Sequence, residues 1–162
     1  MKITELLGEA TEYDKKQSVE RKKPKSWLKT VSAFANTGGG VLIFGVADND
    51  EIVGIENIKE ASEFVSQKIK ERIDPLPEVF MELHKLENDK EILSVKILAG
   101  EETPYYYNGD GTTEAFIRIG NETVTASASE LKRLVLRGRN SSYDSLTSSY
   151  EYDDFSFSKL RE

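Results

Sequence analysis

The segment 27–55 constrains the fold most, because it is the longest stretch with few charges in a chain in which 31% of residues are charged. The apolar residues of its first part recur at the spacing of one helical face: Trp27, Leu28, Val31, Phe34 and Ala35. The sequence therefore predicts a helix here. We expect Ser26 to cap its first turn, and Asn36 and Gly38 to close it in the left-handed conformation.

A buried strand and a hairpin follow this helix. Val41–Phe44 is a continuous apolar run, typical of a strand that is covered on both faces. Residues 48–51 have turn chemistry, and Ile52 begins the return strand. Glycines 38–40 lie after a helix and before a strand, whereas a phosphate-binding loop has the reverse order, and the chain has no Gly-Lys-Ser/Thr. These two facts argue against nucleotide hydrolysis of the P-loop kind.

The remaining sequence predicts further helices interleaved with strands. Asn57 and Glu60 have the spacing of a capping box that opens a second helix, and Ser127 and Glu130 have it for a last helix. Strand patterns occupy residues 9–17, as an edge strand, and then 79–86, 91–98 and 115–119. This order indicates an α+β domain, with a mixed, largely antiparallel sheet of about six strands and two to four helices packed on it.

Composition sets the limits of the domain. The chain has 162 residues, enough for one domain with a real core, which we place at residues 1–140. Residues 141–162 are rich in Ser, Tyr and Asp and are predicted to be a linker or tail toward a downstream region. The absence of cysteine, of a signal peptide and of an apolar run of membrane-spanning length favours a cytoplasmic protein without membrane contact.

Charge is unevenly distributed along the chain. The formal net charge is −7, which disfavours generic nucleic-acid binding. However, residues 1–47 contain eight Lys or Arg and five Asp or Glu, a balance of +3, whereas residues 48–102 contain seven and fifteen, a balance of −8. A basic face near the N-terminal part of the domain is therefore compatible with the acidic total.

Several of these segments together resemble a known family, the Schlafen/AlbA-like domain found in bacterial regulators. The residues that carry the resemblance are Glu12-Tyr13, Ser32-Ala33-Phe34-Ala35-Asn36-Thr37-Gly38-Gly39, Phe44-Gly45-Val46 with Asp48, Val53-Gly54, Asp74-Pro75, Thr103-Pro104-Tyr105 and Ile117-Arg118-Ile119-Gly120. The match extends over about residues 5–140. It implies an N-terminal domain of a longer protein, often one with a downstream winged helix.

The resemblance implies a nucleic-acid-binding domain of a bacterial transcriptional regulator-like protein. The basic residues that we assign to DNA or RNA contact are Lys15, Lys16, Lys22, Lys23, Lys25, Arg118, Arg137 and Arg139. We expect this binding to be weak and electrostatic. We expect no catalysis and no cofactor.

The family also implies an alternative of a different class, a metal-dependent endoribonuclease that uses two glutamates and an aspartate. Matched residue by residue, one family glutamate corresponds to Glu12 and the family aspartate to Asp48, and these two carboxylates would hold Mg²⁺ or Mn²⁺. The position of the upstream glutamate is Leu7, and Glu9 is the nearest carboxylate that could replace it.

A third hypothesis is a protein-interaction or homo-oligomerisation module that uses the acidic segment 48–102. Two other features receive no functional role. His84 lies in an alternating stretch and is interpreted as a strand surface residue. Tyr105, Tyr106 and Tyr107 have the composition of a base-stacking platform, but alternation between core and surface beside a turn is the preferred interpretation.

Overall fold

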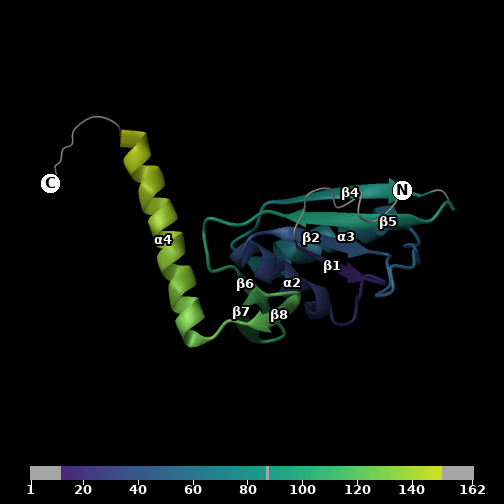
Figure 1. The fold of residues 1–162 in the computed structure, drawn as a ribbon, viewed down its shortest axis with the longest axis horizontal. Coiled ribbons are helices and arrows are strands. Elements are labelled where there is room, and N and C mark those ends of the chain that lie inside the picture. The colour runs from purple at the N-terminus through teal and green to yellow at the C-terminus, as the bar shows by residue number, and fades with distance from the viewer. Residues whose placement is uncertain (1–11, 87, 151–162) are drawn as a thin grey trace.

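The computed structural model describes residues 12–86 and 88–150, with side chains given up to residue 140. In this part of the chain it shows three helices and eight strands (Figure 1). The helices are α2 (Lys25–Asn36), α3 (Ile58–Arg72) and α4 (Ala128–Tyr150). The strands are β1 (Tyr13–Lys16), β2 (Gly40–Phe44), β3 (Ile73–Asp74), β4 (Val79–Lys85), β5 (Glu91–Ile97), β6 (Tyr106–Gly109), β7 (Thr112–Ile119) and β8 (Glu122–Thr125).

The strands form two four-stranded sheets, ordered β1-β2-β5-β4 and β3-β6-β7-β8. All strand pairs are antiparallel except β1 with β2, where Tyr13 is paired with Val41. The predicted α+β class with a largely antiparallel arrangement is confirmed. The division into two sheets, and the short strands β3 and β8, were not predicted from the sequence.

Helix α2 lies between the two sheets (Figure 1). Nine of its residues are buried, and its apolar residues share one core cluster with Phe44 of β2 and Phe116 of β7. The indole of Trp27 meets the ring of Phe44 edge-on, with 5.6 Å between centroids. The predicted packing of this helix on β2 is therefore confirmed for Leu42 and Phe44, while Val41 and Ile43 belong to a second cluster on the other face.

The ends of α2 differ from the prediction. The N-cap is Pro24, whose proline ring presets the helical φ, and no side chain caps the first turn, so the role predicted for Ser26 is wrong. At the other end Asn36 remains helical, and the left-handed residue is Gly39, with φ +78°. A Cβ on Gly39 would lie 2.8 Å from the Ile97 carbonyl oxygen, so glycine is required there by both conformation and space.

Capping boxes were predicted for two helices, and one is present. Helix α3 follows Asn57 as expected, but Asn57 has φ +51° and makes no side-chain cap. The other predicted member of the box, Glu60, binds Arg21 instead, at 2.6 and 2.8 Å. At α4 the box is complete. The Ser127 N–H donates to Glu130 Oε1 at 2.8 Å, and the Glu130 N–H donates to Ser127 Oγ at 3.3 Å.

Helix α4 is anchored to the domain near Thr103. The Thr103 hydroxyl donates to the Leu134 carbonyl at 2.6 Å, and a Cβ on Gly138 would collide with the Thr103 carbonyl oxygen. The helix continues past residue 140 to Tyr150, so its backbone enters the segment that we predict to be a linker or tail. The domain boundary itself stays a prediction. None of the helices in the described residues is long and apolar enough to cross a membrane.

Candidate functional site

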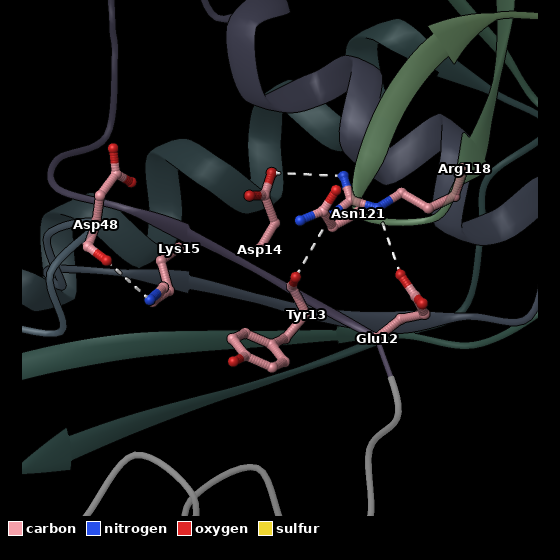
Figure 2. Close-up of a pocket in the computed structure, with 7 residues that line it drawn as sticks. All are labelled: Glu12, Tyr13, Asp14, Lys15, Asp48, Arg118 and Asn121. Carbon is pink, nitrogen blue, oxygen red and sulfur yellow. Dashed lines mark hydrogen bonds and ion pairs between the residues drawn. The ribbon is translucent and has the colours of Figure 1, made fainter.

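A polar pocket of about 300 Å³ lies at the β1 edge of the first sheet (Figure 2). Its residues come from β1 and the residue before it, from the loop after β2, from β7 and from the turn between β7 and β8: Glu12, Tyr13, Asp14, Lys15, Asp48, Arg118 and Asn121. Successive residues of a strand point to opposite faces, so Glu12 and Asp14 share the face that meets Arg118. The pocket thus joins residues of both sheets.

Arg118 is the buried centre of this pocket. Its side chain is 4% exposed, and its guanidinium lies 3.5 Å from Glu12 Oε1 and 3.8 Å from Asp14 Oδ2. It donates to Thr123 Oγ1 at 2.8 Å and to the Tyr13 carbonyl at 3.3 Å, and it stacks over the Phe34 ring at 5.1 Å. One buried nitrogen, Nε, has no hydrogen-bond partner in the described residues. Arg118 therefore links β7 to β1 across the two sheets.

Lys15 lies at the other side of the pocket. Its ammonium binds the Asp50 carboxylate and donates to the Asp48 carbonyl at 3.2 Å. The hydrogen bond to Asp50 is the largest influence on the Lys15 ammonium and raises its pKa above the ordinary value. The lysine is therefore charged at any physiological pH, and it compensates the acidic turn that follows β2.

Glu12 and Asp48, the predicted metal ligands, do line the same pocket, but at its two ends. In Figure 2, Lys15 and Asp14 lie between them. Among the side chains that the structure describes, in residues 12–86 and 88–140, no group of three or more Asp, Glu, His or Cys residues is placed to hold a metal ion. The Glu12 and Asp14 carboxylates also face the fixed Arg118 cation, which opposes a second cation there. The described carboxylates alone therefore do not make up a divalent-metal site, and the third predicted ligand, Glu9, lies outside the described residues.

The predicted nucleic-acid contacts do not gather in one patch. Lys15 and Lys16 lie on β1, where Lys16 is 3.6 Å from Asp14. Lys22 and Lys23 are exposed in the β1–α2 loop, and the described part of the chain places no carboxylate within ion-pair distance of either ammonium. Their own N–H groups donate to Glu20.

The other predicted cations are separated by the length of α2. Lys25, in its first turn, binds Glu114 at 2.6 Å and lies over the rings of Tyr107 and Phe116. Arg137 of α4 donates to the Asn36 carbonyl at the opposite end, roughly 16 Å away along the axis for eleven helical steps. Arg139 is exposed on α4. Arg118 is too deeply paired to attract a phosphate.

Three pocket residues were missed by the sequence reasoning: Tyr13, Asp14 and Asn121. Tyr13 is 41% exposed, and its place on a short polar edge strand is the signal that could have identified it. Asn121 follows Gly120 in a turn between two short strands, a pattern that becomes visible only when β8 is recognised. The three tyrosines considered as a base-stacking platform follow the preferred interpretation, alternation between core and surface, because Tyr105 and Tyr107 are buried.

The fold and the pocket define an α+β domain of two four-stranded sheets around a central helix, with a mixed-charge pocket at one sheet edge. The chain belongs to the Schlafen, AlbA_2 family, whose model matches residues 9–127. Among solved structures it is similar to the N-terminal domain of a DNA helicase RecG-related protein from Nitrosomonas europaea, determined by NMR. That similarity has a TM-score of 0.50 and 22% identity over 74% of this chain and 86% of the other. None of the curated proteins compared with the chain matches it.

Proposed function

We propose that this domain binds nucleic acid, with the β1 pocket receiving an unpaired base and the β1–α2 loop contacting the backbone. The observation that carries the proposal is the combination of an exposed tyrosine with acidic and amide groups in one pocket, in a chain of this family. We infer the finer role, the DNA-binding part of a bacterial transcriptional regulator-like protein, from the family resemblance.

The charges of the pocket favour a base over a phosphate. The Glu12, Asp14 and Asp48 carboxylates repel a phosphate, and they can accept hydrogen bonds from the amino groups of bases. Asn121 adds a group that both donates and accepts. The Tyr13 ring points to the opposite side of β1 from the Glu12 and Asp14 carboxylates (Figure 2), and there its exposed face can stack an unpaired base beside the pocket, a contact worth about 1–3 kcal/mol.

The phosphate contacts fall to the exposed loop. Lys22 and Lys23 are adjacent and solvent-exposed, and unlike Lys15 and Lys25 their ammonium groups form no ion pair with a described carboxylate, although their backbone N–H groups donate to Glu20. Two or three such contacts in a chain with a net charge of −7 support only weak binding, on the order of 10⁻⁴–10⁻⁶ M and strongly dependent on salt.

The proposal is tested by fluorescence anisotropy with labelled single-stranded RNA, single-stranded DNA and duplex DNA at low salt. We expect single strands to bind more tightly than the duplex. Lys22→Glu/Lys23→Glu should abolish binding, and Tyr13→Ala should weaken it by about tenfold, the value of one lost stacking contact. The matched control is Lys59→Glu/Lys70→Glu, which makes the same charge change at two exposed lysines of α3. Equal losses in both double variants would refute the loop assignment.

Endoribonuclease activity is the second candidate, favoured by the shared position of Glu12 and Asp48 in one pocket. The same samples, incubated with RNA and Mn²⁺, discriminate between the two functions. Cleavage that Glu12→Ala or Asp48→Ala abolishes would replace the binding proposal. If neither binding nor cleavage occurs with any probe at low salt, the protein-interaction hypothesis prevails.

A further inference from the structure

Strand β4 leaves one side of the first sheet open, at the edge opposite β1. Its hydrogen bonds to β5 are made by even-numbered residues: the Leu86 N–H donates to the Lys90 carbonyl at 2.8 Å, and the Leu98 N–H donates to the Glu78 carbonyl at 3.0 Å. Backbone groups alternate along an antiparallel strand, so the odd-numbered residues Val79, Met81, Leu83 and Lys85 direct their N–H and C=O groups outward. No strand in the described residues pairs with this side.

The exposed edge is apolar in its middle. Phe80 is 54% exposed and Leu83 is 47% exposed, although both lie within a regular strand. Edge strands are usually protected by charges or proline along their length. Here Pro77 and Lys85 lie at the two ends, and Glu82 is the one carboxylate within β4. A strand that combines unpaired backbone groups with exposed apolar side chains is suited to pair with another strand.

We propose that β4 pairs antiparallel with β4 of a second copy of this chain, with Leu83 opposite Leu83 on the two-fold axis. In this register the outward-facing residues exchange about six backbone hydrogen bonds. Glu82 then lies opposite His84 of the partner, and the pair occurs twice by symmetry. Shifting the register by two residues in either direction places Glu82 opposite itself or His84 opposite itself. Repulsion between two Glu82 carboxylates disfavours the first of these shifts, and in the proposed register a His84 ring N–H can donate to the Glu82 carboxylate of the partner copy.

Pairing in this way joins the four strands of each copy into one continuous sheet, with β1 at both outer edges. The two β1 strands are then seven strand spacings apart, roughly 34 Å measured across the sheet. If the nucleic-acid proposal holds, the dimer would present two pockets at this separation to unpaired bases. The dimer itself does not depend on that proposal.

Disulfide cross-linking tests the register, because the chain has no cysteine of its own. Directly opposed residues in this ladder have Cα atoms about 4.5–5.5 Å apart, within the range of a disulfide. Leu83→Cys should therefore form a covalent dimer under mild oxidation, whereas the control Leu136→Cys, on an equally exposed leucine of α4, should not. A mixture of the Glu82→Cys and His84→Cys variants should cross-link faster than either variant alone.

Sedimentation velocity over a concentration series tests the association itself. We expect the wild type to dimerise and Leu83→Lys to raise the dissociation constant by more than about tenfold, since two charges would meet on the axis. Leu136→Lys is the matched control, and thermal melts verify that both variants fold. The proposal is overturned if the wild type sediments as a monomer at every concentration, if both variants dissociate equally, or if cysteine at residue 83 cross-links no faster than at residue 136.

Discussion

Asn36 offers the sharpest test of how this fold is held together. Its side chain is fully buried at the end of α2 and hydrogen-bonds three backbone groups outside the helix. Nδ2 donates to the carbonyls of Tyr105 and Phe116, both at 2.9 Å, and Oδ1 accepts from the Tyr105 N–H at 2.7 Å. The Asn36 amide therefore satisfies backbone groups of Tyr105, just before β6, and of Phe116 in β7 that a neighbouring strand would otherwise satisfy. Asn36→Ala would leave these buried groups without that partner.

The expected cost follows from the groups left unsatisfied. The Tyr105 carbonyl keeps the hydroxyl of Ser32, so Asn36→Ala leaves two groups unsatisfied, the Tyr105 N–H and the Phe116 carbonyl. Each buried donor or acceptor without a partner costs about 1–3 kcal/mol, so the free energy of unfolding should fall by roughly 2–6 kcal/mol. Urea denaturation followed by circular dichroism measures this difference. A domain of this kind is stable by only about 5–15 kcal/mol, so the shift in midpoint is large.

The matched control is Asn49→Ala. Asn49 Oδ1 also accepts a backbone N–H, that of Glu51 at 3.1 Å, but in an exposed turn where water can replace it. Its loss should cost less than about 1 kcal/mol. If Asn36→Ala costs no more than Asn49→Ala, the buried amide does not hold the second sheet to α2 and the reasoning is wrong.

Two further predictions concern the core and the last helix. Phe34→Ala should cost about 3–5 kcal/mol, because the ring is fully buried beneath β2, and a urea melt showing a loss under about 1 kcal/mol would contradict this. The hydrogen bond from the Ser127 N–H lowers the pKa of the Glu130 carboxyl. The ionised carboxylate therefore stabilises the folded state at pH values above the pKa of an ordinary carboxyl, and this stabilisation is lost as the pH falls through the lowered pKa. Glu130→Gln should accordingly melt below the wild type at neutral pH and together with it in acid. A difference that persists in acid would contradict the linkage.

The sequence predicts local elements well wherever one face is apolar. The periodicity of Trp27, Val31 and Phe34 determined α2, and the unbroken run Val41–Phe44 determined β2, because burial on one or both faces leaves a direct pattern in the sequence. Strand β8 escaped prediction because its four residues are polar or half-buried and make no such pattern. The division into two sheets escaped for a different reason, since strand partnership depends on contacts far apart in the chain.

The site was predicted in part for the same physical reason. Glu12 directly precedes β1 and Asp48 follows β2, and these two strands pair in parallel, so a position along the same sheet edge was within reach of the sequence. The register of the pair, which places the two carboxylates at opposite ends of the pocket, was not. The role of Arg118 was not, because a guanidinium that attracts phosphate and one that neutralises two carboxylates have the same sequence signature. Only the approach of β7 to β1 distinguishes them. The basic residues likewise look like one patch in the sequence, while α2 separates Lys25 from Arg137 in space.

The segment that carries the family resemblance and the pocket are connected through β7. Ser32 Oγ donates to the Tyr105 carbonyl at 2.7 Å and accepts from the Phe116 N–H at 3.2 Å, beside the bonds of Asn36 to the same two residues. Phe116 and Arg118 lie two residues apart on β7. The polar groups of α2 that hold the Phe116 backbone therefore also fix the position along β7 from which Arg118 reaches β1. The Ser32–Asn36 pair thus acts on the pocket without lining it. Its substitution is expected to disturb the contact of Arg118 with Glu12 and Asp14 even where the domain still folds.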